Sequence, residues 1–133
     1  MKTFRIIAGA AALWLSTVFI SAGADVTART VELIATRDNQ FKLGGGAKGP
    51  LTLKAGETVK FRIMAYFGGE KARDGSVHSF VVRDLRDNGW DVRLKEGMNE
   101  FTLVAPGAGD YLVECTVKCG PGHDSMNMKM QVR

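Results

Sequence analysis

The chain has 133 residues, of which 18 are basic and 14 are acidic, and its formal net charge is +4. This length predicts one domain. Two of the basic residues, Lys2 and Arg5, lie in an N-terminal segment that we expect to be removed, which leaves a charge of +2. Such a small charge indicates neither nucleic acid nor an anionic membrane as a partner.

The N-terminal segment has the three parts of a secretory signal peptide. Two basic residues open it, an apolar run extends to about Ile20, and Ala22-Gly23-Ala24 offers an Ala-x-Ala cleavage site. We therefore expect residues 1–24 to be a signal peptide and residues 25–133 to be a periplasmic or secreted domain. The alternative is a retained segment that anchors the domain in the membrane and faces it toward the periplasm.

The rest of the chain has the pattern of short strands. Hydrophobic and polar residues alternate, and turn signals recur about every eight to twelve residues. No stretch keeps a helical period, so we expect an all-β sandwich or barrel. The expected strands centre on residues 31–35, 51–53, 59–63, 77–82, 90–94, 101–105, 111–115 and 128–132.

Two details of this pattern lead to further expectations. Lys54–Glu57 reads as a turn between two alternating stretches, residues 51–53 and 59–63, and these are expected to form a hairpin. Trp90 opens a later strand and is expected to anchor the core.

The residues with distinctive chemistry gather near the C-terminus. Both cysteines and one of the two histidines lie within Cys115–Met126, with the spacing Cys-x3-Cys-x3-His-x2-Met. The other histidine, His78, begins an expected strand, whereas Cys115 ends one and Met126 begins one. Loops at one end of a sandwich lie side by side, so these residues could meet there.

Two thiolates, imidazoles and a thioether favour a soft or borderline metal, above all copper. A mononuclear blue-copper centre uses one cysteine and would leave the second unused. Two thiolates that bridge two copper ions, with one histidine for each ion, use every Cys and His. Zinc bound by two Cys and two His would leave Met126 without a role. A disulfide between Cys115 and Cys119 would leave His123 and Met126 unexplained.

These residues also carry a family resemblance. His78-Ser79-Phe80 and the Cys115–Met126 motif together resemble the binuclear copper (CuA) domain of cytochrome c oxidase subunit II, and a similar domain occurs in nitrous oxide reductase. The resemblance extends to the Leu53–Glu57 turn and to the Pro106–Tyr111 segment before the cysteines. It implies a cupredoxin-like Greek-key β-sandwich over residues 25–133, with two copper ions as cofactor.

The resemblance also implies a role for each ligand. The cysteines would be bridging thiolates, the histidines terminal ligands, and one thioether and one backbone carbonyl weak ligands. The implied ligands are His78, Cys115, the Val117 carbonyl, Cys119, His123 and Met126. The family usually has Glu at the position of Val117, where its side chain helps to hold magnesium, so no magnesium is implied for this chain.

Other departures from subunit II concern its partners. Subunit II has transmembrane helices ahead of the copper domain and a Trp that receives electrons, whereas here residues 38–42 and 66–67 contain no Trp. Val81 also stands where the family usually has Trp after His-Ser-Phe. Docking to cytochrome c in the manner of the oxidase is therefore not implied, and we expect a free-standing, exported CuA cupredoxin.

Three functions remain as hypotheses. The first is a one-electron carrier between redox proteins, such as a cytochrome and a terminal oxidase or reductase. The second is a copper delivery or storage protein that exchanges metal with copper chaperones. The third is a thiol-disulfide protein, although such proteins place Cys-x3-Cys before a helix that this sequence does not offer. The sequence signals no nucleophile–base pair and no substrate pocket, so an enzyme is not expected.

Overall fold

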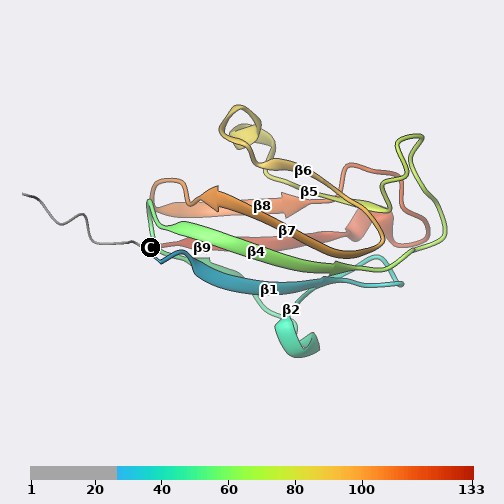
Figure 1. Ribbon diagram of the computed structural model, residues 1–133, viewed down its shortest axis with the longest axis horizontal. Coiled ribbons are helices and arrows are strands. Elements are labelled where there is room, and N and C mark those ends of the chain that lie inside the picture. Colours follow the sequence, from blue (N-terminus) through green and yellow to red (C-terminus); the bar gives the residue numbers. More distant parts are fainter. Residues whose placement is uncertain (1–26) are drawn as a thin grey trace, which may run out of the picture.

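The computed structural model describes residues 27–133, which form two packed β-sheets and three short 3-10 helices (Figure 1). The expected signal peptide, residues 1–24, lies outside the described residues. In spatial order, the first sheet contains β2 (Phe41–Leu43), β1 (Arg29–Ala35), β4 (Thr58–Ala65) and β7 (Gly97–Val104). The second sheet contains β3 (Leu51–Leu53), β9 (Asn127–Val132), β8 (Gly109–Glu114), β5 (His78–Val81) and β6 (Asp91–Leu94). The 3-10 helices are η1 (Gly44–Gly46), η2 (Arg83–Asn88) and η3 (His123–Ser125).

Alternation of hydrophobic and polar residues decides which face of each strand is buried. Along β4, Val59, Phe61 and Ile63 are fully buried, and the residues between them are partly exposed. In β9, Met128 and Met130 face inward in the same way. Because each sheet has one apolar face, the two sheets pack face to face. The all-β sandwich expected from the sequence is confirmed.

Aromatic rings fill the centre of the sandwich. The ring of Phe80 lies 5.2 Å from that of Phe61 and 6.0 Å from that of Trp90, measured between centroids. Trp90 is 1% exposed, and its indole Nε1 donates a hydrogen bond of 3.1 Å to the Val104 carbonyl. Burying one such ring contributes about 1.5–3 kcal/mol. Trp90 is therefore the core anchor that the sequence predicted.

The expected hairpin between β3 and β4 is wrong, because these strands belong to different sheets. β3 pairs in parallel with β9, whereas β4 pairs with β1 and β7. Between them, the Ala55 amide donates to the Arg133 carbonyl in one sheet, and the Gly56 amide donates to the Ala105 carbonyl beside the other. Both strands have one apolar face, and both faces are buried in the same core between the sheets.

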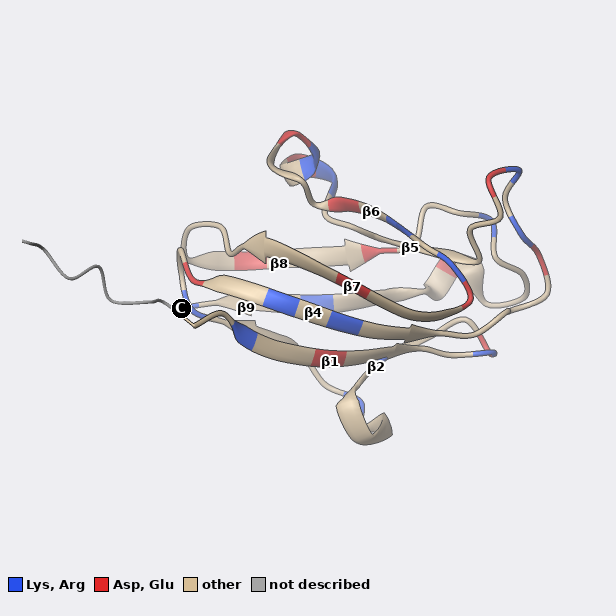
Figure 2. Cartoon of the chain, viewed as in Figure 1, with Lys and Arg blue, Asp and Glu red and all other residues tan. Residues whose placement is uncertain are grey.

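The outer face of the first sheet is exposed to solvent. It carries charged side chains that alternate in sign from strand to strand and form ion pairs (Figure 2). The Arg62 guanidinium lies 2.8 Å from the carboxylates of both Glu32 and Glu100 on the neighbouring strands. Such exposed pairs contribute about 0–1 kcal/mol each. Within residues 27–133, no helix is long and apolar enough to cross a membrane.

The strand directions bring three long loops to one end of the sandwich. β1, β4 and β8 end there, and β5 and β9 begin there. The loops at residues 36–40, 66–77 and 115–126 therefore lie together, at the end opposite the C-terminus (Figure 1). This shared end contains every residue singled out for metal binding.

Candidate metal centre

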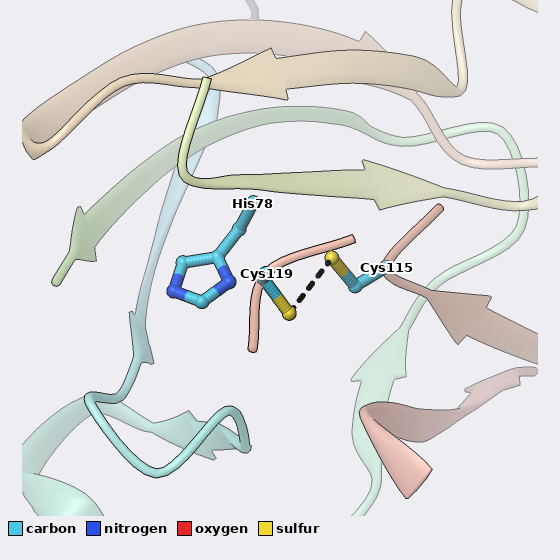
Figure 3. A group of neighbouring side chains, drawn as sticks. All are labelled: His78, Cys115 and Cys119. Atoms are coloured by element: carbon cyan, nitrogen blue, oxygen red, sulfur yellow. Dashed lines mark hydrogen bonds between the residues drawn. The ribbon is translucent and has the colours of Figure 1, made fainter. Parts of the chain in front are cut away.

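His78 and the two cysteines meet at this end of the sandwich (Figure 3). His78 begins β5, Cys115 follows the end of β8, and Cys119 lies in the next loop. One possible ligand atom from each of these residues lies within 4.8 Å of the other two, and all three residues are buried. Residues 37 positions apart in the sequence are therefore neighbours in space, as the strand-end argument predicted.

The Cys119 sulfur lies at the middle of the cluster. It lies 3.8 Å from Cys115 Sγ, 3.4 Å from His123 Nδ1 and 3.8 Å from Met126 Sδ. The Val117 carbonyl oxygen lies 3.3 Å from Cys115 Sγ. The structure thus brings together all six residues that the sequence singled out as ligands.

The two cysteines are free thiols. Their sulfurs are 3.8 Å apart, whereas a disulfide requires about 2.05 Å. The Ser79 amide lies 3.4 Å from Cys115 Sγ and donates to it. Two buried sulfurs at this separation can both contact ions placed beside them.

His78 is held in one orientation with one ring nitrogen free. Its Nε2 lies 2.7 Å from the Tyr66 carbonyl oxygen, which can only accept, so Nε2 carries the proton. Its Nδ1 is buried without a hydrogen-bond partner, and Figure 3 shows it turned toward Cys119. Leaving such an atom unpaired costs about 1–3 kcal/mol, which a bound cation would offset.

Burial also sets the protonation of the ligand side chains. Desolvation lowers the pKa of His78 and so favours the neutral imidazole that a metal requires. Desolvation, together with the neighbouring Cys115, raises the pKa of Cys119 to about 12. The Cys119 thiol therefore keeps its proton at neutral pH unless a cation displaces it.

The Gly-Pro-Gly segment between Cys119 and His123 gives the loop its shape. Gly120 has a φ of 126° and Gly122 a φ of 90°, values that residues with a side chain rarely adopt. A Cβ on Gly120 would also collide with the Gly68 carbonyl oxygen of the neighbouring loop. After this segment, η3 turns the chain back, and the Met126 amide donates to the His123 carbonyl at 3.0 Å.

Hydrogen bonds between elements hold the cysteine loop against its neighbours. The Thr116 amide donates to Ser79 Oγ at 2.7 Å, and the two hydroxyl oxygens lie 2.9 Å apart. The Cys115 amide donates to the Met126 carbonyl at 3.1 Å. The Tyr66 carbonyl and Thr116 could not be found from the sequence, since a backbone acceptor has no residue signature and Thr116 lies at an unspecified position of the Cys-x3-Cys spacing.

His123 differs from the other expected ligands because it is partly exposed, whereas Cys115, Cys119, Met126 and His78 are buried. The centre therefore reaches the molecular surface at this histidine.

Solved structures of similar fold include two chains of oxidases and a blue copper protein. A chain of a heme-copper terminal oxidase dimer has a TM-score of 0.58 and 19% identity, over 86% of this chain and 68% of that one. The periplasmic domain of subunit II of cytochrome oxidase from Bradyrhizobium japonicum has a TM-score of 0.53 and 14% identity, over 79% and 83%. Auracyanin A, a blue copper protein of Chloroflexus aurantiacus, has a TM-score of 0.53 and 21% identity, over 80% and 100%.

These similarities confirm the expected fold, which is a cupredoxin-like β-sandwich. No protein-family model matches the sequence, and no curated protein matches it significantly.

Proposed function

We propose that the chain is an exported one-electron carrier with a binuclear CuA-type copper centre. The observation that carries this proposal is the pair of buried sulfurs, 3.8 Å apart, with both histidines close to them. His123 Nδ1 lies 3.4 Å from Cys119 Sγ, and the unpaired Nδ1 of His78 faces the same cluster.

The donor set supports two ions better than one. A single blue-copper ion uses one thiolate, two imidazoles and a thioether. In this cluster it would leave a second buried cysteine beside the metal with no role. Two bridging thiolates would instead give each ion both sulfurs and one imidazole, with Met126 Sδ and the Val117 carbonyl as weak additional ligands.

Hydrogen bonds within the chain hold the ligand residues in place, which suits electron transfer. Copper, when bound, would supply the one-electron redox chemistry. The chain orients His78 through the Tyr66 carbonyl, fixes the cysteine loop through Ser79 and Thr116, and excludes water from the sulfurs by burial. Ligands held in this way need little rearrangement when the charge of the site changes, so the barrier to electron transfer stays low.

The solved structures of similar fold also support a role in electron transfer. One is a periplasmic domain of an oxidase subunit, and another is a blue copper protein. We infer that this chain likewise serves redox proteins of the periplasm, such as a cytochrome on one side and a terminal oxidase or reductase on the other. In this role the chain passes electrons and is not itself an enzyme.

A second candidate is copper delivery or storage with the same ligands. The partial exposure of His123 favours it, because an exposed ligand gives an acceptor protein access to the metal. In this role the partner would be a copper chaperone or an apo-enzyme.

Copper counting combined with a one-electron titration tests the proposal. The purified protein should take up two copper ions per chain and then cycle reversibly by one electron per pair of ions, with both ions retained. Loss of copper to an acceptor, with no stable one-electron state, would favour delivery. Uptake of a single ion per chain would refute the binuclear assignment.

A further inference from the structure

Asn39 lies in the loop between β1 and β2, and its backbone has an uncommon conformation. Its φ is 56°, and within residues 27–133 it is the one residue other than glycine with a positive φ. The Thr36 carbonyl accepts from the Asn39 amide at 3.1 Å, which closes the turn. Asn39 is 1% exposed, although it lies in a loop. The turn therefore directs a polar side chain into the protein.

The side-chain amide of Asn39 joins two loops that are far apart in the sequence. Its Nδ2 donates to the Pro121 carbonyl at 2.6 Å and to the Gly68 carbonyl at 3.0 Å. Both partners can only accept hydrogen bonds, so the NH2 group must face them. A side chain without two donor hydrogens could not satisfy both carbonyls from this position.

Each of these loops positions one of the two histidines. Pro121 lies two residues before His123 in the cysteine loop. Gly68 lies two residues after Tyr66, whose carbonyl accepts from His78 Nε2. One loop therefore orients His78, and the other carries His123; these two residues would be the terminal ligands of the centre.

The three loops approach so closely that no larger side chain fits between them. A Cβ on Gly68 would collide with the Asn39 amide, and a Cβ on Gly122 would lie 3.0 Å from the Asp38 carbonyl oxygen. One further hydrogen bond, from the Glu70 amide to the Cys119 carbonyl at 3.1 Å, joins the same two loops. Asn39 thus supplies two of the bonds that set their separation.

We propose that Asn39 is a positioning residue of the metal centre. Its side-chain amide fixes the distance between the loop that orients His78 and the loop that carries His123. This inference rests on the proposed function for its effect on copper, but not for its effect on the loops. Loss of the side-chain amide would leave the buried Gly68 carbonyl and the Pro121 carbonyl without this donor, and would let the cysteine loop move relative to His78.

Two variants of Asn39 separate hydrogen bonding from packing. Asn39→Gly tolerates the positive φ and removes the amide. Asn39→Asp keeps the size and also tolerates this φ, but it replaces the donor by a carboxylate that faces two carbonyl oxygens. Val59→Ala is the control, because Val59 is fully buried at the other end of β4 and its truncation lowers stability without touching these loops.

The first measurement uses the metal-free, reduced full-length chain. Hydrogen exchange of the Glu70 amide should rise roughly tenfold in both Asn39 variants, relative to Val59→Ala at equal global stability. Unchanged exchange in Asn39→Asp would show that packing alone matters, and unchanged exchange in both variants would overturn the proposal. This result does not depend on whether copper binds.

The second measurement uses the copper-loaded chain. Both Asn39 variants should release copper to a Cu(I) chelator about 10–100-fold faster than the parent protein, with an altered copper EPR spectrum. Val59→Ala should keep the parent spectrum and release rate. If the parent protein binds no copper pair, the proposed function fails, and the exchange result still decides the role of Asn39 in the loops. If the parent protein binds the pair and the Asn39 variants match it, the positioning role is refuted.

Discussion

Cys119 is the residue on which the proposed centre most depends. Its sulfur is fully buried and lies within 3.8 Å of atoms from Cys115, His123 and Met126. Residue type and spacing singled out these four residues in the sequence as expected ligands, because few side chains bind soft metals. The Tyr66 carbonyl and Asn39 could not be identified in this way, since a backbone acceptor has no residue signature and Pro121, which Asn39 contacts, lies 82 positions away.

Replacement of Met126 by Leu tests the weak ligand. Leu has a similar volume, so the free energy of unfolding should fall by less than about 1.5 kcal/mol. Two copper ions should still bind, but the midpoint potential should rise, because a donor to the oxidised ion is lost. Potentiometry of the parent and the variant measures this shift. An unchanged potential would show that the thioether does not contact the metal.

The metal-free, reduced protein should lose stability in alkali. The pKa of Cys119 is about 12 in the folded chain, above its ordinary value of 9.0, so the unfolded chain releases this proton first. This contribution to stability is complete below pH 9.0 and declines as the pH rises toward about 12. Denaturant midpoints at about pH 7 and about pH 10.5 measure the decline. Cys119→Ser should show a smaller decline, and an equal decline in the variant would disprove the assignment.

Among the elements, strands were predicted more accurately than their partners. The alternation of Val59, Phe61 and Ile63 identified β4, and that of Leu51 and Leu53 identified β3. Their assignment to one hairpin was wrong, because alternation reveals which face is apolar but not which strand lies alongside. The partners of β3 and β4 depend on residues more than 25 positions away, such as Met130 opposite Leu51.

The cysteine loop offers a matched pair of glycine variants. Gly120→Ala and Gly45→Ala both place a side chain at a positive φ, which costs about 1–3 kcal/mol. A Cβ at Gly45 meets nothing within 4 Å, whereas one at Gly120 collides with the Gly68 carbonyl. Gly120→Ala should therefore also lose copper occupancy, and Gly45→Ala should keep it. Copper counting on both variants, beside thermal denaturation, distinguishes backbone strain from displacement of the loop.

Equal copper occupancy in the two glycine variants would contradict the view that contact between the loops at residues 66–77 and 115–126 shapes the centre.

On the scale of the whole molecule, the β-sandwich holds three loops together at one end. Strand directions place residues 36–40, 66–77 and 115–126 together, and the core behind them holds rings such as Phe80 and Trp90 in contact. Fold similarity to an oxidase subunit domain and to a blue copper protein fits this arrangement, but it does not distinguish one copper ion from two. The second cysteine is the feature from which we propose two ions.

The number of equivalent copper nuclei is therefore the central question. Electron paramagnetic resonance of the copper-loaded protein answers it, because one unpaired electron shared by two copper nuclei of spin 3/2 gives seven hyperfine lines. We expect seven lines from the parent protein and their loss in Cys119→Ser, which removes one of the two sulfurs proposed to bridge the ions. Four lines from the parent protein, with one copper per chain, would contradict the binuclear centre.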